Sequence, residues 1–415
     1  MKRRALLLGG LGAAGGLLAA AWLRPGDRGQ PHDAYFQALN RELQANGPMR
    51  PVLLIDLDRL DHNIEVVRQF LARSGKQLRL VEKSLPSPEL LRYLGERLGT
   101  QRLMSFHQPF LNHDARLFPE ADILLGKPLP VRSAQLFYQQ HRGPFDPARL
   151  QQYLALARGL GTRLRINIEL DVGLHRGGVG EAQALAPLLQ LIADHPQHLQ
   201  FAGFMGYDPF VGMNLPALLG TPDELLAKVM ARYQGCVDFT RQRFPALWRE
   251  GLTLNTAGSP SYRAHEQETL SSEVAIGTGL LKPSHYDLPS LAEHVPAVYI
   301  ATPVLKSTGA LRLPALDEKS RLLAWWDVNR RETFFIYGGN WQADFASPAG
   351  LQLSGLYGRS SNQELLNASP AAGLRVDDQV FLRPTQSESV LLQFGDLLAV
   401  RGGRIVERWP VYQEG

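Results

Sequence analysis

The sequence predicts an α/β protein in which a (β/α)8 TIM barrel is followed by a smaller C-terminal β domain. Short apolar runs alternate with segments of helical spacing about eight times over roughly 240 residues, which is the arithmetic of such a barrel. After about residue 295 the pattern changes to short alternating strands separated by turn residues. With 415 residues, 44% of them hydrophobic, the chain is long enough for one large and one smaller core.

The expected barrel elements follow one another along the chain. The run 52–57 is nearly all apolar, which is typical of a parallel strand buried on both faces, and 58–72 has the apolar spacing of a helix. Further barrel strands are expected at 78–81, 102–105, 123–125, 164–170, 201–205 and 252–255. We place the barrel at 45–290.

The expected C-terminal β domain occupies 291–415, and residues 30–44 are candidates to pack on it. Its strands are expected at 297–305, 322–328, 333–337, 379–382, 390–394, 397–401 and 404–407. Glycine and aspartate pairs lie between several of these runs and supply the turns.

Charge and cysteine content exclude several classes of protein. The 44 Lys and Arg residues exceed the 40 Asp and Glu residues by only four, so the pI near 9.1 reflects no basic stripe. Nucleic acid is therefore not an expected partner. The single cysteine, Cys236, excludes an intrachain disulfide and a zinc site built on several thiolates, and its helix-like surroundings predict a packing role.

The segment 1–24 is predicted to be a signal peptide or a membrane anchor. Lys2-Arg3-Arg4 precedes an uncharged run over 5–23, and Ala19-Ala20-Ala21 offers a small-residue cleavage site. The paired arginines resemble a twin-arginine export signal. The run is also just long enough to span a bilayer as an uncleaved anchor. We expect a protein exported to the periplasm or anchored to the inner membrane, with membrane contact only through this segment.

Three expected strand ends carry residues suited to chemistry. Lys83 follows a strand directly, and a lysine there is costly to bury unless it is neutral or covalently bound, so it is a candidate Schiff-base amine or a surface lysine. Arg176 lies in a glycine-rich turn and can pair with an anionic oxygen. The run from Asn255 to Ser261 contains small residues whose backbone N–H groups can converge on a phosphate.

The stretch from Pro51 to Ile64 resembles the opening strand and helix of the alanine-racemase-like, fold-type III pyridoxal-phosphate enzymes. It looks most like the D-threonine aldolase and D-serine dehydratase branch, over about residues 50–290 and more weakly at 404–412. The resemblance implies pyridoxal 5'-phosphate as cofactor, with Lys83 as its Schiff-base lysine and Arg176 at its phenolic oxygen. It further implies a role in the cofactor site for Tyr207, Asn255, Gly258, Ser259, Ser261 and Gly277.

Several residues depart from the pattern of that branch. The two histidines that flank its lysine are absent from 79–86. Gln386 and Glu388 stand where the branch has its His-x-Cys metal pair, so no metal is expected and both become candidate substrate contacts. Ala275 stands where racemases of this fold place an arginine against the pyridine nitrogen.

Three functions remain open at this stage. The first is a metal-independent lyase or aldolase acting on a D- or 3-hydroxy amino acid, the second an amino-acid racemase, and the third a non-catalytic protein that binds pyridoxal phosphate. The candidate bases are Lys83, Tyr207 and His175. The expected partner is a small amino-acid substrate, and a homodimer is possible.

Replacing Arg3 and Arg4 together by lysine is expected to retain the protein in the cytoplasm, because the twin-arginine route reads the arginine pair. Fractionation of cells followed by immunoblotting measures this, with Lys2→Gln as a control that keeps the pair. Unchanged export would point to the general secretory route. A mature chain that keeps Met1 in the membrane would identify an uncleaved anchor.

Overall fold

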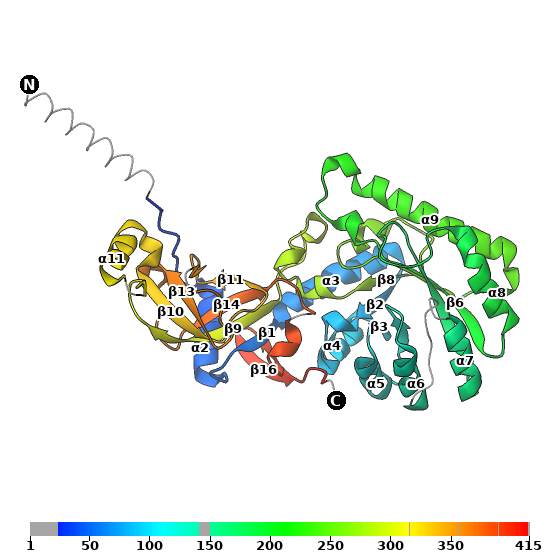
Figure 1. Cartoon of the computed structure of the whole chain (residues 1–415), viewed down its shortest axis with the longest axis horizontal. Coiled ribbons are helices and arrows are strands. Elements are labelled where there is room, and N and C mark those ends of the chain that lie inside the picture. Colours follow the sequence, from blue (N-terminus) through cyan, green and yellow to red (C-terminus); the bar gives the residue numbers. More distant parts are fainter. Residues whose placement is uncertain (1–23, 141–149, 315, 356, 389, 414–415) are drawn as a thin grey trace, which may run out of the picture. The chain divides into compact units, whose positions relative to one another are not determined.

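The computed structural model describes residues 24–140, 150–314, 316–355, 357–388 and 390–413 (Figure 1). The expected export signal at 1–24 therefore lies outside the described residues, except for its last position. The described chain divides into two compact units. The barrel unit comprises 53–298, 384–402 and 406–413, and the β unit comprises 24–52, 299–383 and 403–405. The boundaries expected from the sequence remain predictions.

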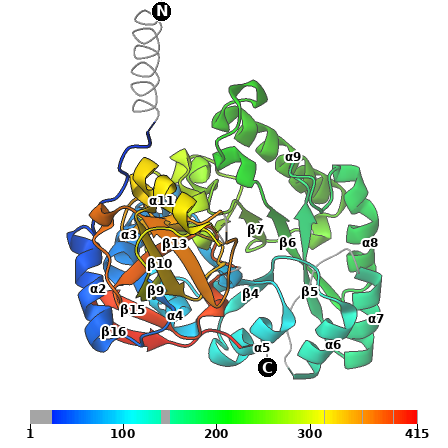
Figure 2. The same cartoon turned by 60° about the vertical axis from the view of Figure 1, so that its left-hand side comes forward.

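Seven parallel strands form a nearly closed barrel in the barrel unit, in the order β4-β3-β2-β8-β7-β6-β5. This confirms the predicted fold class. Helices α5 to α9 lie on the outer side of these strands (Figure 2). The strands are β2 (Gln77–Val81), β3 (Arg102–Ser105), β4 (Asp122–Leu125), β5 (Leu164–Leu170), β6 (Leu199–Gly206), β7 (Thr253–Thr256) and β8 (Glu273–Ile276).

Helices of the barrel unit precede, separate and follow these strands along the chain. They are α3 (Leu57–Ser74), α4 (Pro88–Leu98), α5 (Gln108–Leu117), α6 (Val131–Gln140), α7 (Leu150–Leu160), α8 (Ala186–Asp194), α9 (Pro222–Arg243) and the short α10 (Thr278–Leu281). A capping box begins α9, because Thr221 accepts from the backbone of Glu224 and Glu224 accepts from the backbone of Thr221. Cys236 is buried in α9, as predicted, and burial raises the pKa of its thiol to about 11.

The structure corrects the assignment of the first strand. The run expected to open the barrel is β1 (Val52–Asp56), which pairs in parallel with β15 (Leu397–Arg401). All five β1 residues are buried, as the apolar run predicts. However, β2 already has β3 and β8 as neighbours, so β1 has no place in the barrel and β2 is its first strand. Residues 141–149, between α6 and α7, lie outside the described residues.

The β unit is built on a long strand, β9 (Val298–Ser307), which pairs antiparallel with β10 (Glu332–Tyr337) and β14 (Gln379–Pro384). Its other strands are β11 (Ala343–Ser347), β12 (Gln352–Leu353) and β13 (Gln363–Ala368), and β16 (Arg404–Trp409) crosses from this unit into the barrel unit. Helix α2 (Ala34–Asn46) packs on the sheet, with the rings of Phe36 and Phe381 4.9 Å apart.

Two of the strands expected after residue 290 are wrong. The run 390–394 forms a turn that contains the 3-10 helix η12 (Leu391–Gln393). The run 322–328 belongs to helix α11 (Asp317–Trp326) and a 3-10 turn (Val328–Arg330). Ser320 and Ala324 are buried four residues apart while Leu322 and Trp325 are exposed, so the buried positions follow the helical period and not the strand period. Among the described residues, no helix combines the length and apolar character needed to cross a bilayer.

Candidate active site

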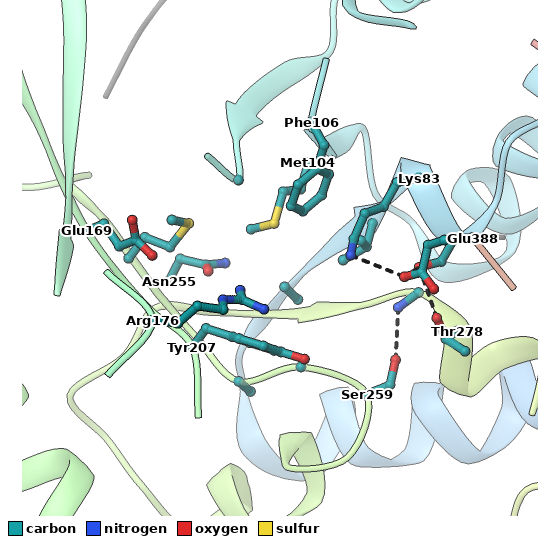
Figure 3. A pocket seen from close by; sticks show the side chains of 18 of the residues that line it. Lys83, Met104, Phe106, Glu169, Arg176, Tyr207, Asn255, Ser259, Thr278 and Glu388 are labelled. Carbon is teal, nitrogen blue, oxygen red and sulfur yellow. Dashed lines mark hydrogen bonds and ion pairs between the residues drawn. The ribbon is translucent and has the colours of Figure 1, made fainter. Parts of the chain in front are cut away.

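A cavity of about 610 Å³ lies within the barrel unit, where the strands end at their carboxyl side. Every barrel strand contributes a residue at or just beyond its end, β4 through Gly126. Active sites of TIM barrels lie at this end of the strands. The side chains around the cavity are shown in Figure 3.

Lys83 reaches the cavity from the single 3-10 turn that follows β2, η1 (Glu82–Ser84). Its Nζ lies 3.1 Å from Oε1 of Glu388 and 4.7 Å from the centre of the Phe106 ring (Figure 3). The hydroxyl of Ser84 donates to the same Glu388 oxygen at 2.8 Å. Burial raises the pKa of Glu388, but the charge of Lys83 and these hydrogen bonds outweigh it, so the pKa lies below its ordinary value. Glu388 is therefore a carboxylate beside the lysine amine.

Arg176 and Tyr207 form a second group of side chains in the cavity. The guanidinium carbon of Arg176 lies 4.7 Å from the centre of the Tyr207 ring, and the two side chains stack (Figure 3). Arg176 is brought there because the chain turns back after β5, with the N–H of Val179 donating to the Glu169 carbonyl at 2.9 Å. Gly178 makes this close return possible, since a Cβ there would lie 2.7 Å from the backbone nitrogen of Asp171, and its φ is 92°.

A cup of small residues lines another part of the cavity, after β7 and β8. The Ser259 hydroxyl accepts from the backbone N–H groups of Gly277 at 3.2 Å and Gly279 at 2.9 Å. A Cβ on Gly258 would lie 2.4 Å from the Tyr207 ring, and one on Gly277 would lie 2.7 Å from the Val81 Cβ. Side chains are thus excluded where backbone N–H groups and a hydroxyl converge, which is the chemistry that binds a phosphate in TIM barrels.

The floor of the cavity is apolar. Met104, Met205 and Ala275 pack together there, and Ala275 stands where the resemblance places an arginine. Within the described lining, Lys83 and Arg176 are the cationic side chains. The cavity therefore has its positive charge at its sides and none at its floor.

A buried ion pair lies below this floor. Arg79 of β2 donates to both carboxylate oxygens of Glu273 of β8, at 2.6 and 3.0 Å, and both side chains are fully buried. Asn255 of β7 donates its amide N–H to Glu273 at 2.9 Å. Burial opposes the charge of Arg79, but the carboxylates of Glu273 and Asp122 outweigh it and raise its pKa. These contacts fix the amide of Asn255 at the edge of the cavity.

The structure gathers most of the predicted site residues and leaves three outside. Eight of them line the cavity: Lys83, Arg176, Tyr207, Asn255, Gly258, Ser259, Gly277 and Glu388. His175 has φ 56° and a largely exposed side chain that bonds Asp171 at 2.9 Å, so it does not reach the cavity. Gln386 is exposed and also does not line it.

Ser261 is the third residue outside the cavity. Its hydroxyl accepts from the N–H of Gly258 at 3.2 Å and donates to Asp208 at 2.7 Å, away from the cavity. Asp208 in turn lies 2.7 Å from Nε2 of His265. Ser261 therefore holds the backbone of Gly258 in place and does not itself face the cavity.

His265 is buried between two carboxylates, because Asp208 lies on one side and Glu268 lies 3.6 Å away on the other. Burial lowers its pKa, but the hydrogen bonds to these carboxylates outweigh burial and raise the pKa to about 9. His265 is therefore an imidazolium at neutral pH. It completes a chain of contacts that ends at the backbone of Gly258.

Some cavity residues were missed by sequence reasoning. Glu169 lines the cavity at the end of β5, and burial raises the pKa of its carboxyl despite the nearby charge of Arg176. Glu169 lies at a strand end and Phe106 lies just after β3, and these positions in the sequence could have marked both as site residues. Tyr286 lies in a short turn far from any strand end, and no local pattern marks it.

The chain belongs to the family described as alanine racemase, N-terminal domain, which matches residues 55–284. Members of this family bind pyridoxal 5'-phosphate, act on small amino-acid substrates and are often dimers. A search of curated proteins finds no match.

Solved structures of the same fold cover most of the chain. A D-threonine aldolase from Filomicrobium marinum is 16% identical, with a TM-score of 0.67 over 88% of this chain and 97% of that one. A D-threo-3-hydroxyaspartate dehydratase from a Delftia species is 17% identical, with a TM-score of 0.65 over 88% and 97%. An alanine racemase from Bacillus anthracis, with bound L-Ala-P, is 14% identical, with a TM-score of 0.66 over 88% and 98%.

Replacing His265 by glutamine is expected to remove a pH dependence of stability. The pKa of His265 is about 9 in the folded chain against an ordinary 6.5, so its stabilising effect is complete below pH 6.5 and is lost as the pH rises through 9. The wild type should lose on the order of 3 kcal/mol across this window through this group. Urea unfolding at several pH values measures the loss. The free energy of unfolding of His265→Gln should vary less with pH than that of the wild type, whereas the surface control His62→Gln should behave as the wild type. Equal pH dependence in all three proteins would contradict the raised pKa of His265.

Proposed function

We propose that this chain is a pyridoxal-phosphate-dependent enzyme that acts on an amino acid, as a metal-independent lyase or aldolase of D- or 3-hydroxy amino acids. The observation that carries the proposal is the placement of Lys83. Its amine opens into a cavity that also holds a cup of small residues, with backbone N–H groups and the Ser259 hydroxyl, and a guanidinium. An amine nucleophile, an anion cup and a cation are the groups that a pyridoxal-phosphate site requires.

The residues present fit this cofactor. Gly258, Ser259 and Gly277 would hold its phosphate, because they line the cavity where small residues leave room for it. In the structure the N–H of Gly277 donates to the Ser259 hydroxyl and that of Gly258 to the Ser261 hydroxyl, and a phosphate oxygen would replace these acceptors. Arg176 would pair with its phenolic oxygen, and Lys83 would bond to it covalently. When bound, the cofactor supplies an electron sink for negative charge at the substrate α-carbon.

The chain's own residues then determine how protons and substrate are handled. Lys83 and Tyr207 line the cavity and are the candidate groups that hold or move a proton. Glu388 presents a carboxylate beside the lysine amine, which repels acidic side chains of a substrate and favours basic ones. The absence of a cation among the described residues of the floor favours a protonated ring nitrogen, a stronger sink that suits elimination or retro-aldol cleavage.

Racemisation is the second candidate, because Lys83 and Tyr207 both line the cavity and proton exchange at the α-carbon uses a base on each side. For the N-terminal segment we propose export to the periplasm, on the strength of its arginine pair and uncharged run.

Lys83 is the residue whose loss should abolish covalent cofactor binding. Purified protein incubated with pyridoxal phosphate should turn yellow, and borohydride should fix the cofactor on Lys83, which peptide mapping identifies. Lys83→Ala should remain colourless, whereas the exposed Lys127→Ala should behave as wild type. Protein that takes up no cofactor, or that is labelled at another lysine, would overturn the proposed site.

Removing divalent metal is expected to leave turnover intact. Within the described residues, no group of three or more His, Cys, Asp or Glu side chains is arranged to hold a metal ion. A panel of D- and L-amino acids, with and without EDTA, should give keto acid or aldehyde release at equal rates. Solvent deuterium uptake without product would identify a racemase, and neither signal a non-catalytic binder. Activity abolished by EDTA and restored by zinc or manganese would contradict the metal-independent reaction.

A further inference from the structure

A group of buried polar side chains lies beside β2, outside the described lining of the cavity. Val81 and Lys83 line the cavity, whereas Glu82 between them does not and is fully buried. Ser105 at the end of β3 and Asp114 of α5 are also fully buried beside it. Glu82 is thus the direct neighbour of the proposed cofactor lysine in the same 3-10 turn, with its carboxyl in a place sealed from solvent.

The hydrogen bonds of this group leave two carboxyl oxygens unsatisfied. Ser105 donates to Oε2 of Glu82 at 3.3 Å, and the Tyr412 hydroxyl donates to Oδ1 of Asp114 at 2.5 Å. The other oxygens, Oε1 of Glu82 and Oδ2 of Asp114, are buried and have no hydrogen-bond partner among the described residues. The Ser105 hydroxyl has one proton, so it cannot serve both carboxylates at once.

Two ionised carboxylates are not tolerated in such a place. Burial, and then the charge of Asp114, raise the pKa of Glu82 well above its ordinary value, and burial raises the pKa of Asp114 to about 7. The cation that acts on Glu82 is Lys83, and its amine pairs with Glu388. A proton kept between the two carboxyls removes one charge and turns an unsatisfied oxygen into a donor.

The same group ties the lysine turn to the C-terminal segment. The backbone N–H of Tyr412 donates to the carbonyl of Pro86, three residues after Lys83, at 2.9 Å. The Tyr412 ring lies 4.8 Å from that of Phe110 in α5. Tyr412 therefore contacts both the chain after Lys83 and the helix that carries Asp114.

We propose that Glu82 and Asp114 share one proton as an acid–carboxylate pair, and that this pair positions the turn that carries Lys83. Glu82 acts through the backbone of its neighbour and is a positioning residue, not a catalytic one. The positioning role rests on the proposed function, because it concerns cofactor capture by Lys83. The shared proton does not depend on the proposed function.

Other ionisable groups surround the pair and must be kept apart from it in a test. Lys83 lies next to Glu82 in the same turn and faces the cavity. Glu89 of α4 is half-buried and paired with Arg92, and its charge contributes to raising the pKa of Tyr412. His113 of α5 has its ring 5.6 Å from that of Tyr412. Glu82→Gln leaves all of these groups unchanged. A difference in pH dependence between this variant and the wild type therefore reports on the Glu82–Asp114 pair.

The first experiment measures thermal unfolding of the full chain without cofactor as a function of pH. Groups with a raised pKa make the folded chain keep protons that the unfolded chain releases, so they lower stability as the pH rises from near 4 to about 7. Glu82→Gln should shrink this fall, because its amide N–H donates to an ionised Asp114. The exposed Glu96→Gln on α4 should behave as wild type. A Glu82→Gln profile that parallels wild type would overturn the shared proton.

Asp114→Asn provides the reciprocal variant, in which the new amide donates to Glu82, and it should flatten the profile in the same way. A shared-proton pair accepts an amide on either side, so failure of both variants to fold at any pH would also contradict the proposal.

The second experiment measures the rate at which pyridoxal phosphate is captured on Lys83. Glu82→Leu leaves Asp114 unpaired and should slow capture by roughly tenfold or more, since misplacement of a reacting group has effects of that size. Glu82→Gln should restore the rate. Equal rates in Glu82→Leu and wild type would remove the positioning role. Absence of capture in wild type would instead refute the proposed function, while the stability profile would still test the pair.

Discussion

The ion pair between Arg79 and Glu273 is the interaction on which the site depends most. It joins β2 to β8, the neighbouring strands whose ends carry Lys83 and Gly277. Both charges are fully buried, so loss of either would remove the main partner of the other and leave it one half-buried partner, Asp122 for Arg79 and Arg102 for Glu273. Because Glu273 also accepts from Asn255 of β7, one carboxylate connects three neighbouring barrel strands beneath the cavity.

β2 and the 3-10 turn that follows it give neighbouring residues two separate roles. Arg79 bonds across to Glu273, whereas Val81, Lys83 and Ser84 line the cavity. Glu82, in the same 3-10 turn as Lys83, lies buried beside Asp114 of α5. An amine that must react and an acid that must stay buried can therefore stand next to each other in sequence without meeting in the same space.

Much of the fold and part of the site could be predicted from the sequence, because the signals were local. Apolar runs alternating with helical spacing revealed the barrel, and reactive residues directly after strands revealed Lys83 and Arg176. The partner of β1 could not be found this way, since β15 is more than 300 residues distant and strand pairing leaves no mark on either run. Side-chain direction was equally hidden. His175 and Arg176 are adjacent, yet a left-handed backbone at His175 sends only Arg176 to the cavity.

The burial of Cys236 makes the protein well suited to chemical labelling. It is the one cysteine of the chain, it is 3% exposed, and its pKa of about 11 keeps it a thiol at neutral pH. Maleimide and iodoacetamide reagents, which react with exposed thiolates, will leave it unmodified. A cysteine introduced at the exposed position Gln386, two residues before Glu388, would then be the single point of attachment for a fluorophore. Such a probe would report ligand entry into the cavity without the need to remove the native thiol from the core.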